Sequence, residues 1–188
     1  MDSRRSTTWV QVLWAVAGLV LLGGAFLALF AGGDDVTVIA VPLGLAMLFA
    51  GASNTLIYHK KRSVLHGAHW LLADGLSTAL LSIFPLFNRM VMPGVVPFFF
   101  GVWELFSGIL KAIDAHELRE DEIRGSHWFA GIGIAEILSG IAALLKPVDV
   151  FVGMHRVVAI VFFVQSCGFI SKALLYPRLV KGEAALDS

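Results

Sequence analysis

Two glutamates stand out because each lies inside an apolar run and is flanked by glycines at the same spacing. The octets Gly101–Gly108 and Gly133–Gly140 place Glu104 and Glu136 three residues after the first glycine and four before the last. At helical spacing these glycines share a face with the glutamate, so each octet presents a smooth strip that carries one acid. Acids inside apolar spans are rare and usually face protein or a wet cavity, so both are candidate functional groups.

Two interpretations of these glutamates stay open. Each carboxyl can be a hydrogen-bonding group that holds helices in register, with Gln165 or Ser139 as its partner. Each can instead bind and release a proton, because burial favours the neutral form of a carboxyl group. Gln165 is therefore a further member of the proton-responsive candidates.

Asp74 is the fourth proton-responsive candidate. It follows Trp70 by about one helical turn, so we expect it to lie near the membrane surface and still to reach interfacial water. A cation would stabilise its charged form there. Lys111 and Lys172 are the expected pairing partners.

The composition is that of an integral membrane protein. Of the 188 residues, 57% are hydrophobic and 15% are charged, with a mean hydropathy of +0.81, which leaves too little charge to cover a soluble domain. A helix needs roughly 20 apolar residues to cross about 30 Å of hydrocarbon. The predicted fold class is all-α, a polytopic membrane protein of six transmembrane helices: Trp9–Ala31, Val36–Tyr58, Val64–Phe87, Val91–Ile113, Trp128–Leu145 and Val150–Leu175.

The basic residues predict that both termini are cytoplasmic. Lysine and arginine concentrate on the cytoplasmic side of membrane proteins. With the N-terminus inside, three of them fall towards the outside: Arg89, Lys146 and Arg156. The others fall in or beside cytoplasmic segments: Arg4, Arg5, Lys60, Lys61, Arg62, Lys111, Arg119, Arg124, Lys172, Arg178 and Lys181.

Internal similarity predicts one membrane domain, residues 1–188, built from three tandem helical hairpins at 9–58, 64–113 and 128–175. His69-Trp70 and His127-Trp128 open the second and third hairpins, at an offset of 127 − 69 = 58 residues. The frame from Gly44 to Gly51 repeats at Gly101–Gly108, at an offset of 101 − 44 = 57. A fixed period of this size indicates a repeat architecture.

Met47 stands where this repeat places Glu104. Gln165 is expected opposite Glu104 in the last hairpin, and Lys172 opposite Lys111, because both pairs are separated by seven residues. The six glycines that frame the strips, Gly44, Gly51, Gly101, Gly108, Gly133 and Gly140, are expected to pack helices.

The polar segment 114–127 is predicted to be a solvated cytoplasmic linker, with partner docking as the alternative. Trp70 and Trp128 are expected to anchor the membrane interface, together with Lys111 and Lys172. Tryptophan is enriched at this level of the bilayer. His69 and His127 adjoin the two tryptophans and are expected to share this role.

The runs Trp128–Pro147 and Phe100–Ile113 resemble the repeat of the HdeD-like acid-resistance membrane proteins. In that family a tryptophan opens each hairpin, Gly-Ile steps fill the first helix and a proline closes it. The first repeat departs from this pattern, because Pro42 lies inside its second span. The resemblance implies a six-span protein of the bacterial inner membrane, connected with acid stress, and it carries over no catalytic residues.

No motif of enzyme chemistry is found, neither a nucleophile elbow nor a phosphate-binding loop nor a zinc helix. No cofactor or metal is expected, and the single cysteine, Cys167, cannot form an intrachain disulfide. The lipid bilayer is the expected partner; a homo-oligomer is left open, and nucleic acid is not expected. The predicted function is a non-enzymatic protein linked to acid-stress resistance. The alternatives are a small-solute or proton transporter or channel, and a structural membrane scaffold.

Overall fold

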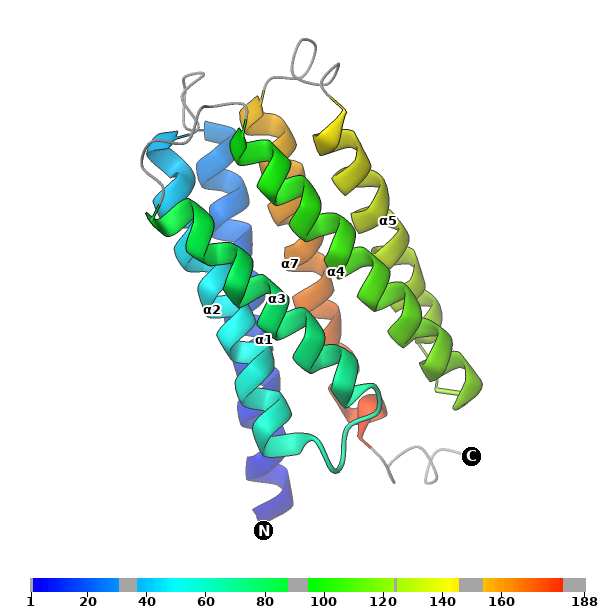
Figure 1. Cartoon of the computed structure of the whole chain (residues 1–188). Coiled ribbons are helices and arrows are strands. Elements are labelled where there is room, and N and C mark those ends of the chain that lie inside the picture. The colour runs from blue at the N-terminus through cyan, green and yellow to red at the C-terminus, as the bar shows by residue number, and fades with distance from the viewer. Residues whose placement is uncertain (1, 31–36, 88–94, 124, 146–153, 181–188) are drawn as a thin grey trace.

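The computed structural model describes residues 2–30, 37–87, 95–123, 125–145 and 154–180. Apart from one β-bridge between Leu65 and Val180, the regular structure in these residues is helical. The helices are α1 (Asp2–Phe30), α2 (Thr37–Lys61), α3 (Ala68–Phe87), α4 (Val95–Glu120), α5 (Ser126–Leu144) and α7 (Met154–Leu179). They form one bundle in which α1 begins and α7 ends at the same end (Figure 1).

Within the described residues, five helices are long and apolar enough to cross a membrane, namely α1, α2, α3, α5 and α7. This confirms five of the predicted spans. The α4 helix lies along the same direction in the bundle (Figure 1). Its apolar sequence contains three charged residues, Glu104, Lys111 and Asp114.

The closest helix pairs are α2 with α3, α4 with α5, and α1 with α7. The pairs that correspond to the predicted hairpins, α1 with α2, α3 with α4, and α5 with α7, make fewer contacts. The packing unit is therefore offset by one helix from the predicted hairpin unit. The two ends of the chain supply the third close pair and close the ring of helices.

Glycines allow these close approaches. A Cβ added to Gly108 would lie 2.8 Å from Gly133 O and 2.8 Å from Ile137 N, and one added to Gly51 would lie 2.7 Å from Gly75 O. Ordinary Cβ contacts are 3.4–4 Å, so the backbones of α4 and α5, and of α2 and α3, touch directly. Small residues at helix interfaces favour this packing in membranes.

The remaining glycines of the three strips lie equally close to a neighbouring helix. A Cβ on Gly140 would lie 2.7 Å from Leu105 N, and one on Gly101 would lie 3.1 Å from Gly140 O. On Gly44 it would lie 3.0 Å from the Leu86 side chain. All six glycines named from the sequence therefore face a helix within the bundle.

The same contacts give the register of the third pair. Gly133 approaches Gly108 O and Ala112 N, while Gly18 approaches Ser166 O and Ile170 N. The offsets are 166 − 108 = 58 and 170 − 112 = 58, so Ser166 takes the place of Gly108.

The predicted equivalence of Gln165 and Glu104 is therefore wrong. At an offset of 58, Phe162 is the counterpart of Glu104, and Gln165 is the counterpart of Ser107. The seven-residue interval shared by Gln165–Lys172 and Glu104–Lys111 suggested the other register, but the backbone contacts of α7 with α1 exclude it.

Phe162 fills its position as part of an aromatic cluster. Its ring centroid lies 5.3 Å from that of Phe100 and 5.4 Å from that of Trp103, both in edge-to-face geometry. Trp103 donates its indole N–H to Thr78 Oγ1 at 2.8 Å. The cluster joins α3, α4 and α7 next to the polar site described below.

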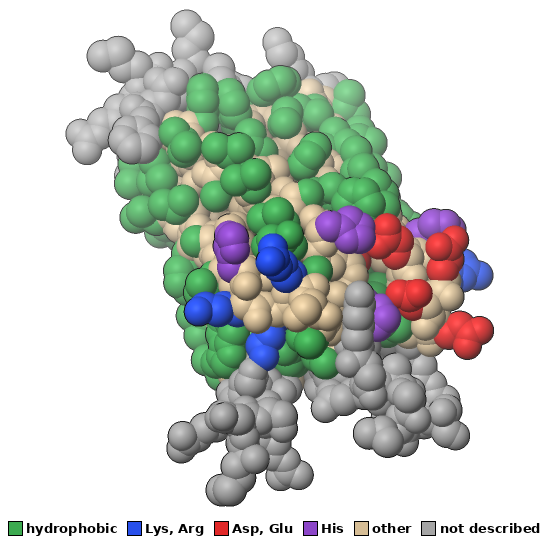
Figure 2. Space-filling model, turned by 60° about the horizontal axis from the view of Figure 1, so that its bottom comes forward, with side chains coloured by type: hydrophobic (Ala, Val, Ile, Leu, Met, Phe, Trp, Pro, Cys, Tyr) green, Lys and Arg blue, Asp and Glu red, His purple; other side chains and the backbone are tan. Residues whose placement is uncertain are grey.

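Charge and apolar surface separate on the molecule. Figure 2 shows hydrophobic side chains over the flank of the bundle and charged side chains gathered at one end, the predicted cytoplasmic end. Acidic and histidine side chains pair there, His66 with Asp121 at 2.8 Å and His69 with Glu117 at 3.3 Å. These pairs tie the predicted linker 114–127 to the loop before α3 and to the start of α3.

Candidate functional site

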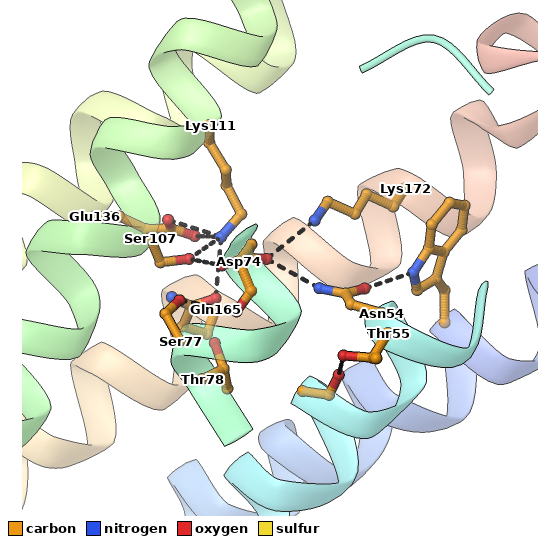
Figure 3. Close-up of polar contacts among 12 residues, drawn as sticks. Asn54, Thr55, Asp74, Ser77, Thr78, Ser107, Lys111, Glu136, Gln165 and Lys172 are labelled. Atoms are coloured by element: carbon orange, nitrogen blue, oxygen red, sulfur yellow. Dashed lines mark hydrogen bonds and ion pairs between the residues drawn. The ribbon is translucent and has the colours of Figure 1, made fainter. Parts of the chain in front are cut away.

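A buried polar network lies between α2, α3, α4, α5 and α7, with Asp74 near its centre (Figure 3). Asp74 Oδ1 accepts a hydrogen bond from Ser107 Oγ at 2.7 Å. Asp74 Oδ2 accepts one from Asn54 Nδ2 at 2.9 Å and one from Lys172 Nζ at 3.3 Å. Trp14 donates its indole N–H to Asn54 Oδ1 at 2.9 Å, which orients the amide.

Lys111 is the second centre of the network. Its ammonium group lies 2.6 Å from Glu136 Oε1 and 2.7 Å from Glu136 Oε2. It also donates to Ser107 Oγ at 2.8 Å and to Gln165 Oε1 at 3.1 Å. Because Ser107 contacts both Asp74 and Lys111, it links the two halves of the network.

Glu104 is the carboxyl that contacts no lysine. Ser139 Oγ donates to Glu104 Oε1 at 3.0 Å, and the Gln165 amide lies beside the carboxyl. Glu104 is fully buried, as is Glu136 on the facing helix. Both glutamates therefore face protein, and Ser139 is one of the two partners named from the sequence.

The network holds more acids than bases. Three carboxyl groups, Asp74, Glu104 and Glu136, share it with two ammonium groups, Lys111 and Lys172, and each of the five residues is at most 5% exposed. If every group were ionised, this buried cluster would carry one net negative charge. An uncompensated charge in a low-dielectric interior is costly.

Asp74 does not lie at interfacial water as expected. It is 3% exposed because α4 and α7 cover it, and it pairs with Lys172. The prediction that Lys111 and Lys172 anchor the interface is also wrong. Their ammonium groups point into the bundle, where each of them meets a buried carboxylate.

The two tryptophans differ. Trp128 is 60% exposed on the apolar flank, a position compatible with an interface anchor. Trp70 is only partly exposed, and its indole nitrogen is buried within the bundle. The adjacent imidazole of His69 lies over its ring at 4.8 Å between centroids.

Asn54 and Ser107 are members of the buried network that the sequence reasoning missed. Asn54 follows Met47 by seven residues, just as Lys111 follows Glu104. Asn54 is therefore the repeat counterpart of Lys111, and this register could have identified it. Ser107 carried no comparable signal, since serine is common in membrane helices.

Two of the cavities lined by described residues bear on the site. A groove of about 450 Å³ runs between α1 and α7, and its lining is apolar except for Arg156. A small cavity of about 10 Å³ adjoins Asp74, Lys111 and Lys172. Within the described ranges, no three histidine, cysteine, aspartate or glutamate side chains are placed to hold a metal ion.

A protein-family profile described as a short repeat of unknown function (DUF308) matches residues 73–145. The match covers α3 from Ala73 onwards and all of α4 and α5, and so contains the three buried carboxyl groups and Lys111. HdeD-like proteins carry this repeat. No curated protein and no solved structure matches the chain. With its five apolar helices, the chain is a multi-pass membrane protein.

Proposed function

We propose that this chain is a non-enzymatic protein of the HdeD type in the bacterial inner membrane, and that Glu104 is a proton-responsive group linked to acid-stress resistance. One observation carries the proton-responsive part. The buried network contains three carboxyl groups and two ammonium groups, and Glu104 is the carboxyl without an ammonium contact. The connection with acid stress rests on the resemblance of the repeat.

Of the three carboxyl groups, Glu104 is the one best suited to keep a proton, because no ammonium group contacts it to compensate a negative charge. Asp74 is compensated by Lys172 and Glu136 by Lys111. A charged Glu104 would add an unpaired carboxylate next to Glu136, where both side chains are fully buried. Its neutral form needs only hydrogen bonds; Ser139 Oγ donates to Glu104 Oε1, and the Gln165 amide lies beside the carboxyl.

Losing this proton would change the packing of three helices. Glu104 lies on α4, Ser139 on α5 and Gln165 on α7. A new charge at their junction would repel Glu136 and compete for Lys111, which now holds Glu136 and Gln165. The network is therefore suited to couple the protonation of one carboxyl to the contact between these helices.

The geometry supports this function better than transport. A transporter would need Glu104, Glu136 and Gln165 to line a wet cavity. Glu104 is fully buried, and it lines neither the apolar groove on the α1–α7 flank nor the small cavity beside Asp74.

The test is unfolding in detergent between about pH 4 and 8, a range that brackets the ordinary and the strongly raised values for a carboxyl group. If the folded state keeps a proton on Glu104 that the unfolded state releases, stability is higher at acidic pH and falls as the pH rises. Glu104→Gln imitates the neutral acid and should reduce this dependence while the fold is kept. Glu120→Gln, at an exposed position of the same helix, is the matched control.

Glu104→Leu separates hydrogen bonding from charge. It removes the groups that Ser139 and Gln165 contact, so it should lower stability at every pH. If Glu104→Gln instead follows the wild type over the whole range, Glu104 is not the proton-responsive group, and the proposal is wrong.

A further inference from the structure

The small cavity lies between α3, α4 and α7, on the side of the network nearer the predicted cytoplasmic end. Five polar side chains line it, those of Trp70, Asp74, Lys111, Asp114 and Lys172. Its volume of about 10 Å³ is close to the minimum that one water molecule requires, and a buried water also needs about two to four polar partners. The lining provides both donors and acceptors.

Two buried atoms of this lining have no hydrogen-bond partner among the described residues. They are the indole nitrogen of Trp70, which is a donor, and Asp114 Oδ1, which is an acceptor. Buried polar groups are nearly always hydrogen-bonded, to protein or to ordered water. One water molecule can accept from Trp70 and donate to Asp114, so the cavity has the chemistry of a water site.

Asp114 lies where this site meets the end of the bundle. It follows the predicted span Val91–Ile113 and is partly exposed. The loop before α3 passes directly over it, because a Cβ added to Gly67 would overlap Asp114 Oδ1. Gly67 has a φ of +62°, which also favours glycine.

The charge environment suits Asp114 to exchange protons. Burial raises the pKa of its carboxyl from 3.8 to about 7, against the opposing effect of Lys172 on α7. Glu117 on α4 and Asp74 on α3 act in the same direction as burial, and Lys111 acts against it. A group with this pKa changes its protonation state near neutral pH.

We propose that a water molecule bound in this cavity passes protons between Asp114 and Asp74, so that the buried network exchanges protons with the predicted cytoplasmic side. The inference rests on the proposed function of Glu104 and adds two points to it. Protons enter from the predicted cytoplasmic side, and Asp114 is the first group that accepts them. Asp114 takes a proton from bulk water. As the bound water receives this proton, it releases another to Asp74, and each O–H bond forms as its neighbour breaks.

The hydrogen-bonded network continues from Asp74 to Glu136, which is an electrostatic neighbour of Glu104. Asp74 Oδ1 lies 2.7 Å from Ser107 Oγ, which lies 2.8 Å from Lys111 Nζ, and Lys111 reaches Glu136 Oε2 at 2.7 Å. Each separation is within hydrogen-bond distance.

Lys111 donates to Ser107 and Ser107 donates to Asp74. The inward step therefore begins when the Lys111 ammonium group gives one proton to Glu136. The resulting amine takes the hydroxyl proton of Ser107, and Ser107 takes the proton from Asp74. The net result is one proton moved from Asp74 to Glu136, with Ser107 and Lys111 unchanged.

The experiment is a rapid drop of pH on the purified protein in detergent, from an alkaline starting value at which Glu104 has released its proton, with the infrared carbonyl band of protonated carboxyl groups followed in time. Glu104→Gln assigns the part of the band that belongs to Glu104. Asp114→Asn should slow the rise of this part by on the order of tenfold or more, while its final amplitude stays. Glu120→Gln should rise at the wild-type rate.

A second variant keeps the test valid if Asp114→Asn folds poorly. Trp70→Phe removes one partner of the water and should also slow the rise, without removing a titrating group. If both variants rise at the wild-type rate, protons reach the network by another route and the inference fails, although Glu104 still responds. If the carbonyl band of the Glu104→Gln variant is the same as that of the wild-type protein, the proposed function itself fails.

Discussion

Two glycines of α5 provide a direct test of the helix packing, because they lie two residues apart on different faces. A Cβ added to Gly133 would lie 2.9 Å from Gly108 O and 2.9 Å from Ala112 N. A Cβ added to Gly131 would meet nothing within 4 Å. The variants Gly133→Ala and Gly131→Ala therefore add the same methyl group in opposite surroundings.

The expected size of the effect follows from these distances. The shortest ordinary contact is 3.4 Å, so α5 must move from α4 by about 3.4 − 2.9 = 0.5 Å in Gly133→Ala. The obstacle is backbone, which cannot turn aside. Overpacking of this kind costs about 1–3 kcal/mol. Both variants gain about 1 kcal/mol of helix propensity, so the difference between them isolates the packing cost of about 1–3 kcal/mol.

The assay is unfolding in mixed micelles, followed by circular dichroism, with both variants measured beside wild type. Gly131→Ala should be as stable as wild type or more stable, and Gly133→Ala should be less stable than Gly131→Ala. If the two variants have the same stability, or if Gly133→Ala is the more stable one, α5 does not approach α4 at this position.

Two further predictions concern the ion pairs and the topology. Lys111→Met leaves Glu136 buried without its cation and should lower the free energy of unfolding by about 3–5 kcal/mol; the double variant with Glu136→Met should recover most of it, and equal losses in both would contradict the pairing. Glu120→Cys, in a Cys167→Ser background, should react with a membrane-impermeant maleimide only after cells are opened, and labelling of intact cells would reverse the predicted orientation.

The helices and their glycine strips could be predicted because their signals are local. Apolar length marks most spans, and Trp128–Leu145 differs from α5 by one or two residues at its ends. The glycines at i−3 and i+4 of each glutamate lie on one face of any α-helix. These signals do not depend on which helix lies opposite.

The partners of the buried charges could not be predicted in the same way. Lys172 is 98 residues from Asp74 in the chain, so no local spacing connects them. A lysine near the end of a span usually extends to the interface, and that general preference led to the wrong position for Lys111 and Lys172. What overrides it here is the burial of two carboxylates, Asp74 and Glu136, each of which is paired with one of these lysines.

The order of helix packing was equally hidden. Short connections favour contact between consecutive helices, yet the ring is closed by α1 and α7 from opposite ends of the chain. The register of α7 depends on how Gly18 meets Ser166 and Ile170. A repeat that carries a glycine in two copies and serine in the third does not reveal this equivalence.

The protonation of Glu104 at neutral pH is the central claim, and the infrared spectrum of the protein tests it most directly. The account predicts a carbonyl band from a protonated, buried carboxyl group at neutral pH. The test uses an Asp114→Asn background, because Asp114, with a pKa of about 7, is itself partly protonated at neutral pH. In this background the band should disappear in Glu104→Gln and remain in Asp74→Asn, whose carboxylate is paired with Lys172 in the structure. A neutral-pH spectrum without the band, or a band that persists when Glu104→Gln is added to Asp114→Asn, would contradict the account.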